Sequence, residues 1–321
     1  MSRWQTYVLA GLVLTLIVAG LGLKGGRGVE ALLWNAGELL GAPVASVKHA
    51  HINYGVYDPV FVADAEPAFA DKERVAIEHI FVSWLGIDAS AIASAFAYAN
   101  ARDRWLMITV EPFMAKRTPT HTAFLPAIAR GDYDAEIVQV CQTIGNLGAP
   151  VFIRWGHEME AASARYPWAG QDPDAFIAAY RHFVGLCKRV VGESFYVWSP
   201  RGDNGLAPYY PGRAYVDYVG VSLYAFPAFD LDVHGRERSF VEAFEERYKR
   251  IDQFDRPVMI AELGVTGDPA YQEAWMRGLF RNAADFPLLK TAVYFNAVDS
   301  PGAWPDKYGI PDWSISSEIF E

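Results

Sequence analysis

The chain has 321 residues, of which 52% are hydrophobic and 14% aromatic, and its formal net charge is −10. This composition excludes an intrinsically disordered chain. The sequence has no long run of Lys and Arg that would track a phosphate backbone, which argues against nucleic acid as a partner. The negative charge favours an uncharged substrate. The length suits one large domain or two ordinary ones, and α/β barrels of about 250 residues are commonly single domains.

Residues 1–24 are predicted to be a membrane-targeting segment. Tyr7 to Leu23 is uncharged and apolar or small throughout, with basic residues on both sides. Its length lies between that of a signal-peptide core and that of a short membrane-spanning helix. The poor cleavage site at Val18-Ala19-Gly20 favours an uncleaved signal anchor over a signal peptide. We expect the rest of the chain to be exported, either held at the periplasmic face of the inner membrane or secreted.

Residues 25–48 are predicted to be a linker or stalk. The segment begins with a Gly-rich stretch that ends at Gly28. It continues from Val29 to Val47 with an apolar pattern that Glu30, Asn35 and Glu38 interrupt, which is typical of an amphipathic helix. The remaining residues, 49–321, are expected to form one catalytic domain.

From residue 51 onward the sequence repeats a short apolar, β-rich run followed by a loop and a longer helical pattern. Eight such runs are predicted to be strands: Ile52–Val56, His79–Trp84, Leu106–Glu111, Val151–His157, Phe195–Ser199, Tyr218–Tyr224, Val258–Glu262 and Ala292–Asn296. Helices are predicted between most of them, at Ala89–Ala101, Asp134–Leu147, Pro173–Val191, Arg238–Phe254 and Pro269–Ala284. The fold class is therefore α/β, as a closed (β/α)8 TIM barrel. A doubly wound open sheet is the alternative, but no Gly-rich phosphate turn follows the first strand.

Several predicted strands end on a polar or aromatic residue, and the carboxyl ends of barrel strands open on one face. These residues are Glu111, His157, Glu158, Ser199, Tyr224, Glu262 and Asn296. Two of them, Glu158 and Glu262, would end strands four and seven and face each other across the mouth of the barrel. Hydrolysis of a glycosidic bond with retention needs such a pair of carboxyls, about 5–5.5 Å apart.

The segment Arg154-Trp155-Gly156-His157-Glu158-Met159 resembles the acid/base motif of glycoside hydrolase family 26, a family of retaining enzymes of clan A. The likeness continues in order through Tyr166-Pro167-Trp168, Val197-Trp198-Ser199-Pro200, Tyr210-Pro211-Gly212, Val216-Asp217-Tyr218-Val219-Gly220, Tyr224 and Ile260-Ala261-Glu262. The resemblance implies that Glu158 is the acid/base, Glu262 the nucleophile, and Tyr224 a hydrogen-bond partner of the nucleophile. It implies no cofactor and no metal.

The resemblance also has departures, which leave the substrate open. Glu160-Ala161 and Tyr294-Phe295 stand where family members commonly have Asn-Gly and a Trp. The implied substrate is β-mannan, mixed-linkage β-1,3-1,4-glucan or a related exopolysaccharide. Further residues are predicted to contact the sugar chain, although packing or structural roles are alternatives for several of them: His157, Trp168, Glu111, Trp198 and Trp304. Trp313 is a second candidate for sugar stacking, or else it pins the carboxyl terminus.

Two other functions remain as alternatives. The first is a membrane-anchored, non-catalytic carbohydrate-binding or scaffold protein of a polysaccharide synthesis or secretion system, although binding alone needs no pair of carboxyls. The second is a metal-dependent hydrolase using His51, His79 and Glu111, which lack a metal-ligand spacing. We expect a monomer.

The chain has two cysteines, Cys141 and Cys187, and both fall in predicted helices. They lack a metal-ligand spacing, so we predict that they are buried free thiols. A disulfide is the alternative in an exported chain.

Overall fold

The computed structural model describes residues 52–59, 67–118, 120–163 and 165–321. The predicted targeting segment and linker, residues 1–48, lie outside these ranges, as does His51. Within the described ranges, no helix has both the length and the apolar character that a membrane span requires.

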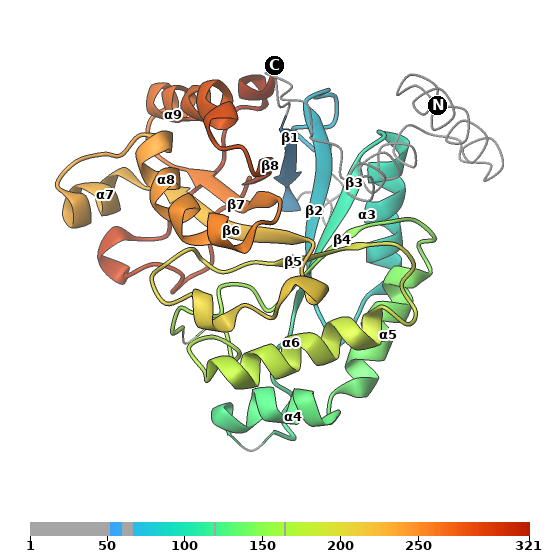
Figure 1. The fold of residues 1–321 in the computed structure, drawn as a ribbon. Helices are drawn as coiled ribbons and strands as arrows, with labels where there is room; N and C mark the ends of the chain where they lie inside the picture. The colour runs from blue at the N-terminus through green and yellow to red at the C-terminus, as the bar shows by residue number, and fades with distance from the viewer. Residues whose placement is uncertain (1–51, 60–66, 119, 164) are drawn as a thin grey trace, which may run out of the picture. The chain divides into compact units, whose positions relative to one another are not determined.

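Eight parallel strands close into a barrel in which each strand pairs with the next along the chain and β8 pairs with β1 (Figure 1). The strands are β1 (Asn53–Tyr57), β2 (Val75–Ser83), β3 (Trp105–Glu111), β4 (Phe152–Trp155), β5 (Phe195–Trp198), β6 (Tyr218–Ala225), β7 (Val258–Val265) and β8 (Leu289–Phe295). All eight predicted strands are therefore confirmed, and so is the closed barrel. The doubly wound sheet is excluded.

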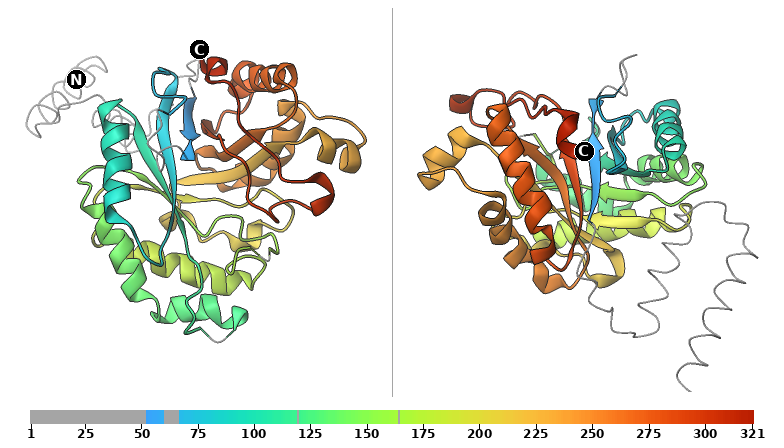
Figure 2. Two further views of the ribbon diagram at one scale, coloured as in Figure 1. Left: turned by 180° about the vertical axis from the view of Figure 1, so that it is seen from behind. Right: turned by 90° about the horizontal axis from the view of Figure 1, so that it is seen from above.

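Helices cover the outside of the barrel, as the two further views in Figure 2 show. They are α3 (Ala89–Ala101), α4 (Phe124–Arg130), α5 (Asp134–Gly145), α6 (Pro173–Cys187), α7 (Pro227–His234), α8 (Phe240–Ile251) and α9 (Pro269–Asn282). The five predicted helices are confirmed: α3 has the predicted bounds, and α5, α6, α8 and α9 are shorter than predicted. Helix α8, for example, begins two residues later than predicted because Ser239 and Glu242 form a capping box. The short helices α4 and α7 were not predicted.

Alternation along the strands fills the barrel in layers. Ile77, Met107, Phe152, Val197, Met259, Ala261 and Val293 form a separate apolar cluster inside the barrel. Their chain neighbours, such as Ile153 and Ile260, belong to the core between barrel and helices. Two residues further along their strands, His79, Thr109 and Arg154 are also buried. The interior therefore changes from apolar to polar toward the carboxyl ends of the strands.

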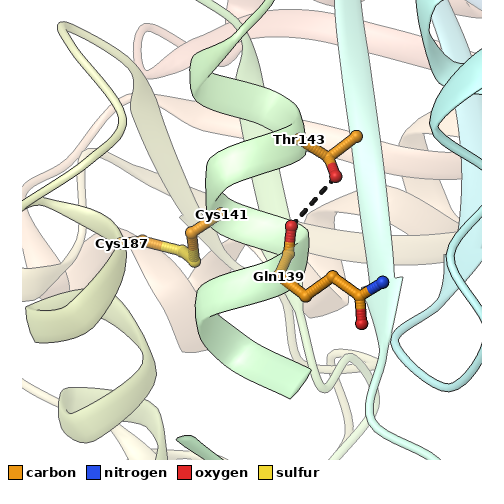
Figure 3. Close-up of a disulfide and its surroundings, with 4 residues drawn as sticks. All are labelled: Gln139, Cys141, Thr143 and Cys187. Atoms are coloured by element: carbon orange, nitrogen blue, oxygen red, sulfur yellow. Dashed lines mark hydrogen bonds between the residues drawn. A yellow bond between two sulfur atoms is a disulfide. The ribbon is translucent and has the colours of Figure 1, made fainter. Parts of the chain in front are cut away.

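The prediction of free thiols is wrong, because Cys141 and Cys187 form a disulfide (Figure 3). Cys141 lies on α5 and Cys187 ends α6, and their Cα atoms are 5.1 Å apart. Both cysteines are fully buried, as expected. The helical patterns did not reveal that α5 and α6 pack against each other, which is what brings the two cysteines together.

Candidate active site

A cleft of about 1020 Å³ opens at the carboxyl ends of the strands. Its wall includes Glu111, Glu158, Tyr224, Glu262 and Trp304, all of them predicted site residues. They come from β3, β6, β7 and the segments that follow β4 and β8. The barrel thus brings together residues that lie far apart in the sequence, as the positions of the strand ends predicted.

A bulge in β7 turns the Glu262 side chain toward the cleft. Met259 and Ala261 face the barrel interior, while Ile260 and Leu263 belong to the outer core. Strict alternation would send residue 262 outward. The pairing of β7 with β8 shifts register between Ile260 and Leu263, and Glu262 lines the cleft. A bulge re-aims a side chain in this way, since it places two consecutive residues against one partner.

Two strong hydrogen-bond donors hold the Glu262 carboxylate. Arg154 donates from Nη1 to Oε1 at 2.5 Å, and the Tyr224 hydroxyl donates to Oε2 at 2.7 Å. The bond from Tyr224 is the contact that the family resemblance implied. The Arg154 side chain is fully buried and that of Glu262 is 9% exposed, so the ion pair is largely screened from water. Both carboxylate oxygens therefore have fixed partners and a fixed direction.

Glu158 has a different environment. Its φ angle is +57°, a left-handed conformation that is uncommon outside glycine, and its amide donates to the Ser199 carbonyl at 2.8 Å. Burial and, secondarily, the nearby Glu262 carboxylate raise the pKa of Glu158 to about 7. The Ser222 hydroxyl, and after it Arg154 and Arg201, oppose this rise only in part. The site thus combines a glutamate paired with arginine and a second glutamate whose carboxyl keeps its proton to a higher pH than usual.

His157 lies beneath these two groups. Its side chain is fully buried, with Nε2 3.9 Å from Glu262 Oε1, and its ring packs edge-on against Tyr166. Burial, with Arg154 nearby, holds the pKa of His157 well below its usual range, so the ring is neutral. Because the ring does not line the cleft, His157 contacts the surroundings of Glu262 and is not placed to touch a sugar.

Glu111 and an aromatic group form the wall next to Glu262. Burial raises the pKa of Glu111 to about 7, and Arg165 offsets part of the rise. Tyr57 stacks on Phe295 with ring centroids 4.8 Å apart and meets Phe81 edge-on at 5.0 Å. All three rings line the cleft, and flat apolar faces of this kind suit the faces of pyranose rings.

Trp304 stands on the far wall, in the segment after β8. Its indole N–H donates to Asp299 at 3.1 Å, and its ring meets that of Tyr224 edge-on. Trp313 donates to the same Asp299 oxygen, but its side chain is fully buried and packs on Tyr224 at 4.7 Å. Trp304 is therefore placed to contact a ligand, whereas Trp313 supports Tyr224 from behind.

Two residues predicted to contact sugar, Trp168 and Trp198, do not line the cleft. Trp168 is fully buried and stacks on Tyr166, and its indole N–H donates to the His157 carbonyl at 2.6 Å. Trp198 is also fully buried and packs on the outside of the barrel against Tyr210 and Phe254. Trp198 points outward because its neighbour Val197 points into the barrel.

The sequence interpretation did not assign a site role to Arg154, although the residue was part of the motif. Phe152 and Arg154 both point into the barrel, so the alternation along β4 contained the signal. Thr109 connects Arg154 to a second buried group: it lies 3.5 Å from Arg154 Nη1 and 2.7 Å from His79 Nε2. His79, proposed as a metal ligand in one alternative, thus has a partner in the barrel interior. In the described ranges no three His, Cys, Asp or Glu side chains are grouped as metal ligands.

A closed (β/α)8 barrel whose cleft holds two carboxyls at the strand ends is an architecture found among glycoside-cleaving enzymes. The family model of glycosyl hydrolase family 26 matches residues 129–256. This range includes the His157-Glu158-Met159 segment and continues through β6.

Known relatives and solved structures agree with this match. A β-1,3-xylanase of a Vibrio species is 23% identical over 210 residues, which cover 59% of this chain and 45% of the relative. Endoglucanase H of Acetivibrio thermocellus is 25% identical over 259 residues, 76% of this chain and 26% of the relative. The chain thus spans less than half the length of these two relatives.

Among solved structures, GH26C from a Muricauda species superposes with a TM-score of 0.60 at 13% identity, over 77% of this chain and 79% of that one. A ruminal GH26 endo-β-1,4-mannanase gives 0.59 at 11% identity, over 85% and 63%. The fold is therefore shared. Together with the family model, these matches support the assignment of the chain to glycoside hydrolase family 26, as the motifs around Glu158 and Glu262 indicated.

Proposed function

We propose that the protein hydrolyses a β-linked polysaccharide with retention of configuration, with Glu262 as nucleophile and Glu158 as acid/base. One observation carries the proposal: the two glutamates face one cleft in opposite electrostatic environments. Arg154 and Tyr224 bind the Glu262 carboxylate, whereas burial and the Glu262 charge raise the pKa of Glu158 to about 7. Two carboxyl groups in unlike environments are typical of an acid/base and nucleophile pair.

In the first step the Glu262 carboxylate attacks the anomeric carbon while Glu158 gives its proton to the glycosidic oxygen. The bond from the anomeric carbon to that oxygen breaks, the leaving chain departs with a hydroxyl, and a glycosyl ester of Glu262 forms. The charge of Glu262 is lost in this step. The pKa of Glu158 then falls, because the Glu262 charge was one of the causes that raised it.

In the second step Glu158, now a carboxylate, removes a proton from water as the water oxygen attacks the anomeric carbon. The ester bond breaks, the Glu262 carboxylate is regenerated and Glu158 is protonated again. The hydroxyl of Tyr224 and the guanidinium of Arg154 receive the returning charge. Two inversions leave the configuration of the anomeric carbon unchanged.

The matched proteins guide the choice of substrate. Those named in the comparisons act as β-1,3-xylanase, endoglucanase and endo-β-1,4-mannanase. We therefore propose a β-linked xylan, glucan or mannan, or a bacterial exopolysaccharide of related linkage, as the class of substrate. The aromatic group of Tyr57, Phe81 and Phe295 supplies a stacking surface beside Glu262 for such a chain.

We also propose that the domain works outside the cytoplasm, anchored at the periplasmic face of the inner membrane by residues 1–24 or secreted after cleavage. The buried Cys141–Cys187 disulfide supports this location, because disulfides persist mainly in oxidising compartments. Fractionation of cells that express the full chain tests it. Activity and protein in the cytoplasmic fraction, with both thiols free, would contradict the proposal.

The test of the reaction is a screen of the full-length protein against mannan, mixed-linkage glucan, β-1,3-xylan and bacterial exopolysaccharides. NMR of the first-formed product should show retention. Glu262→Gln and Glu158→Gln should each lower kcat by about two to four orders of magnitude. An activated glycoside with a good leaving group should rescue the first step in Glu158→Gln and not in Glu262→Gln, because only the acid becomes dispensable. Equal activity of both variants and the parent enzyme would refute the mechanism.

A further inference from the structure

Four arginines line the cleft: Arg165, Arg201, Arg238 and Arg247. Three of them are paired with carboxylates. Arg165 lies 3.7 Å from Asp299, Arg201 forms an ion pair with Asp203, and Arg238 donates to Asp230 at 2.8 Å. Each of these three arginines thus has a carboxylate partner in the protein. Arg247 differs from these three.

Within the described residues, Arg247 forms no ion pair. Its Nη1 donates to the Ala243 carbonyl one turn earlier in α8, at 3.1 Å. Its Nε is buried and has no hydrogen-bond partner. Burial, the largest influence, lowers the pKa of Arg247. Asp203 and Glu246 act on its charge, but neither forms an ion pair with it. A half-buried guanidinium with an unused donor and no carboxylate in direct contact is costly unless something else supplies the partner.

The backbone next to Arg247 leaves room for its side chain at Gly202. Gly202 has φ +99°, and a Cβ added there would lie 2.8 Å from the Arg247 Cγ, so the stem of Arg247 lies directly against this glycine. The Glu160 carboxylate accepts hydrogen bonds from the amides of Arg201, Gly202 and Asp203 at 3.1, 2.9 and 3.2 Å. Arg250, from α8, donates to the Gly202 carbonyl at 2.9 Å. The loop that carries Arg201 is thus fixed on both sides.

This loop lies on the acid/base side of the cleft. Arg201 is close enough to Glu158 for its charge to act on that carboxyl. The charges of Glu262 and Arg165 act on Glu111 and Tyr57, which form the wall next to Glu262. Since Glu158 protonates the leaving oxygen in the proposed reaction, Arg201 and Arg247 lie where the leaving part of the chain binds.

We propose that the leaving-group side of the cleft binds a sugar residue that carries an anionic group, in the first place a uronic acid carboxylate, and that Arg247 and Arg201 receive this group. The inference rests on the proposed function and names its substrate class. It revises the expectation of an uncharged substrate. The net charge of −10 describes the whole surface, whereas the unpaired guanidinium is a local feature of the cleft.

Binding is the first test because it does not depend on turnover. The probes are β-1,4-linked glucuronate and mannuronate tetrasaccharides, each beside its carboxyl-reduced form, which has a hydroxymethyl group in place of each carboxylate. Titration calorimetry with the full-length protein should show at least one acidic probe binding about 10- to 100-fold more tightly than its reduced form. The preference should shrink at high salt. A sulfated form of the neutral probe distinguishes a carboxylate site from a general anion site.

Arg247→Gln should lower the ratio of acidic to neutral affinity by about tenfold, and Arg247→Lys should retain part of it. Arg277→Gln is the matched control, because Arg277 pairs with Glu273 on the exposed face of α9 and should leave the ratio unchanged. If Arg247→Gln fails to fold, Arg201→Gln serves instead.

Equal affinity for each acidic probe and its reduced form, or no binding of either acidic probe, would overturn the inference. So would a preference that Arg247→Gln and Arg201→Gln leave intact. Hydrolysis assays on the same probes separate this result from a failure of the proposed function. Charge preference without hydrolysis would overturn the hydrolase proposal alone, whereas hydrolysis without charge preference would overturn only the inference.

Discussion

Glu158 and Glu262 are the same residue type at the mouth of the same barrel, yet their surroundings have little in common. Glu262 is turned inward by a bulge in a regular strand and is held by Arg154 and Tyr224. Glu158 follows its strand in a left-handed conformation, and Ser222, Arg154 and Arg201 together do not offset the rise in its pKa. The Glu262 carboxylate thus has two fixed hydrogen-bond donors, whereas the groups around Glu158 do not stabilise its charged form enough to offset burial.

The difference shows how one fold gives two identical groups opposite tasks. A nucleophile needs a negative charge at the start of the reaction, and a guanidinium in a dry environment stabilises that charge. An acid needs a proton, and burial beside another carboxylate raises the pKa of the acid so that it stays protonated to a higher pH. Each of the following substitutions removes one side of this contrast.

The largest effect is expected from Arg154→Gln. Without the guanidinium, the Glu262 carboxylate loses its main counter-charge, and we expect kcat to fall by about two to three orders of magnitude. The free energy of unfolding should fall by about 3–5 kcal/mol, since a buried charge is left unpaired. Steady-state kinetics and denaturant titration measure both.

Arg104→Gln is the matched control for this variant. Arg104 forms a buried ion pair with Glu78 at 2.6 Å, away from the cleft lining. Its loss should lower stability to a similar extent and leave kcat of the folded protein unchanged. A kcat that falls equally in both variants would mean that Arg154 acts only through stability.

Tyr224→Phe should have the next largest effect. The variant keeps the ring packed on Trp313 but loses the 2.7 Å hydrogen bond to Glu262. We expect kcat/KM to fall by about 10- to 100-fold, the value of a hydrogen bond to a charged group. Tyr133→Phe removes a buried hydroxyl that bonds to Thr118 and the Ala115 amide instead, and should leave kcat/KM unchanged. Full activity in Tyr224→Phe would show that Arg154 alone orients the nucleophile.

A smaller effect is expected in the dependence of kcat/KM on pH. With the pKa of Glu158 at about 7, about one tenth of the acid remains protonated at one pH unit above it, so kcat/KM should fall by about tenfold per unit on the alkaline side. The pKa of Glu111 is also raised to about 7. If Glu158 causes the alkaline fall in kcat/KM, that alkaline limb of the profile should persist in Glu111→Gln. Its disappearance in that variant would assign the limb to Glu111.

The smallest expected effect is a gain in stability. Burial raises the pKa of Glu158 above its value in the unfolded chain, so between about pH 4.5 and 7 the folded protein holds more protons at this site than the unfolded chain. Stability is therefore lost as the pH rises through this window. Glu158→Gln should remove that loss and raise Tm by a few degrees at pH 8 but not at pH 4. Calorimetry at both pH values tests this, and an equal shift at both would contradict it.

The sequence predicted the barrel well, because eight β-rich runs alternate with helical patterns and each run contains its own evidence. It placed Glu158 and Glu262 at the same face for the same reason. Trp168 and Trp198 were predicted to contact sugar, although they do not line the cleft, because a tryptophan near a strand end looks the same in sequence whether it faces the cleft or the helices. Alternation from Val197 would have placed Trp198 outside. The disulfide depends on helix packing, which no local pattern encodes.

The β7 bulge makes the direction of the nucleophile depend on a residue count as well as on a residue type. If the same residues paired without the bulge, regular alternation would continue from Ile260, and Glu262 would point outward while Leu263 would point into the barrel. Homologues with a glutamate on this strand but an ordinary register would then carry a carboxyl buried against the surrounding helices. Spacing within the strand is therefore the property to compare when this reaction is assigned to distant relatives.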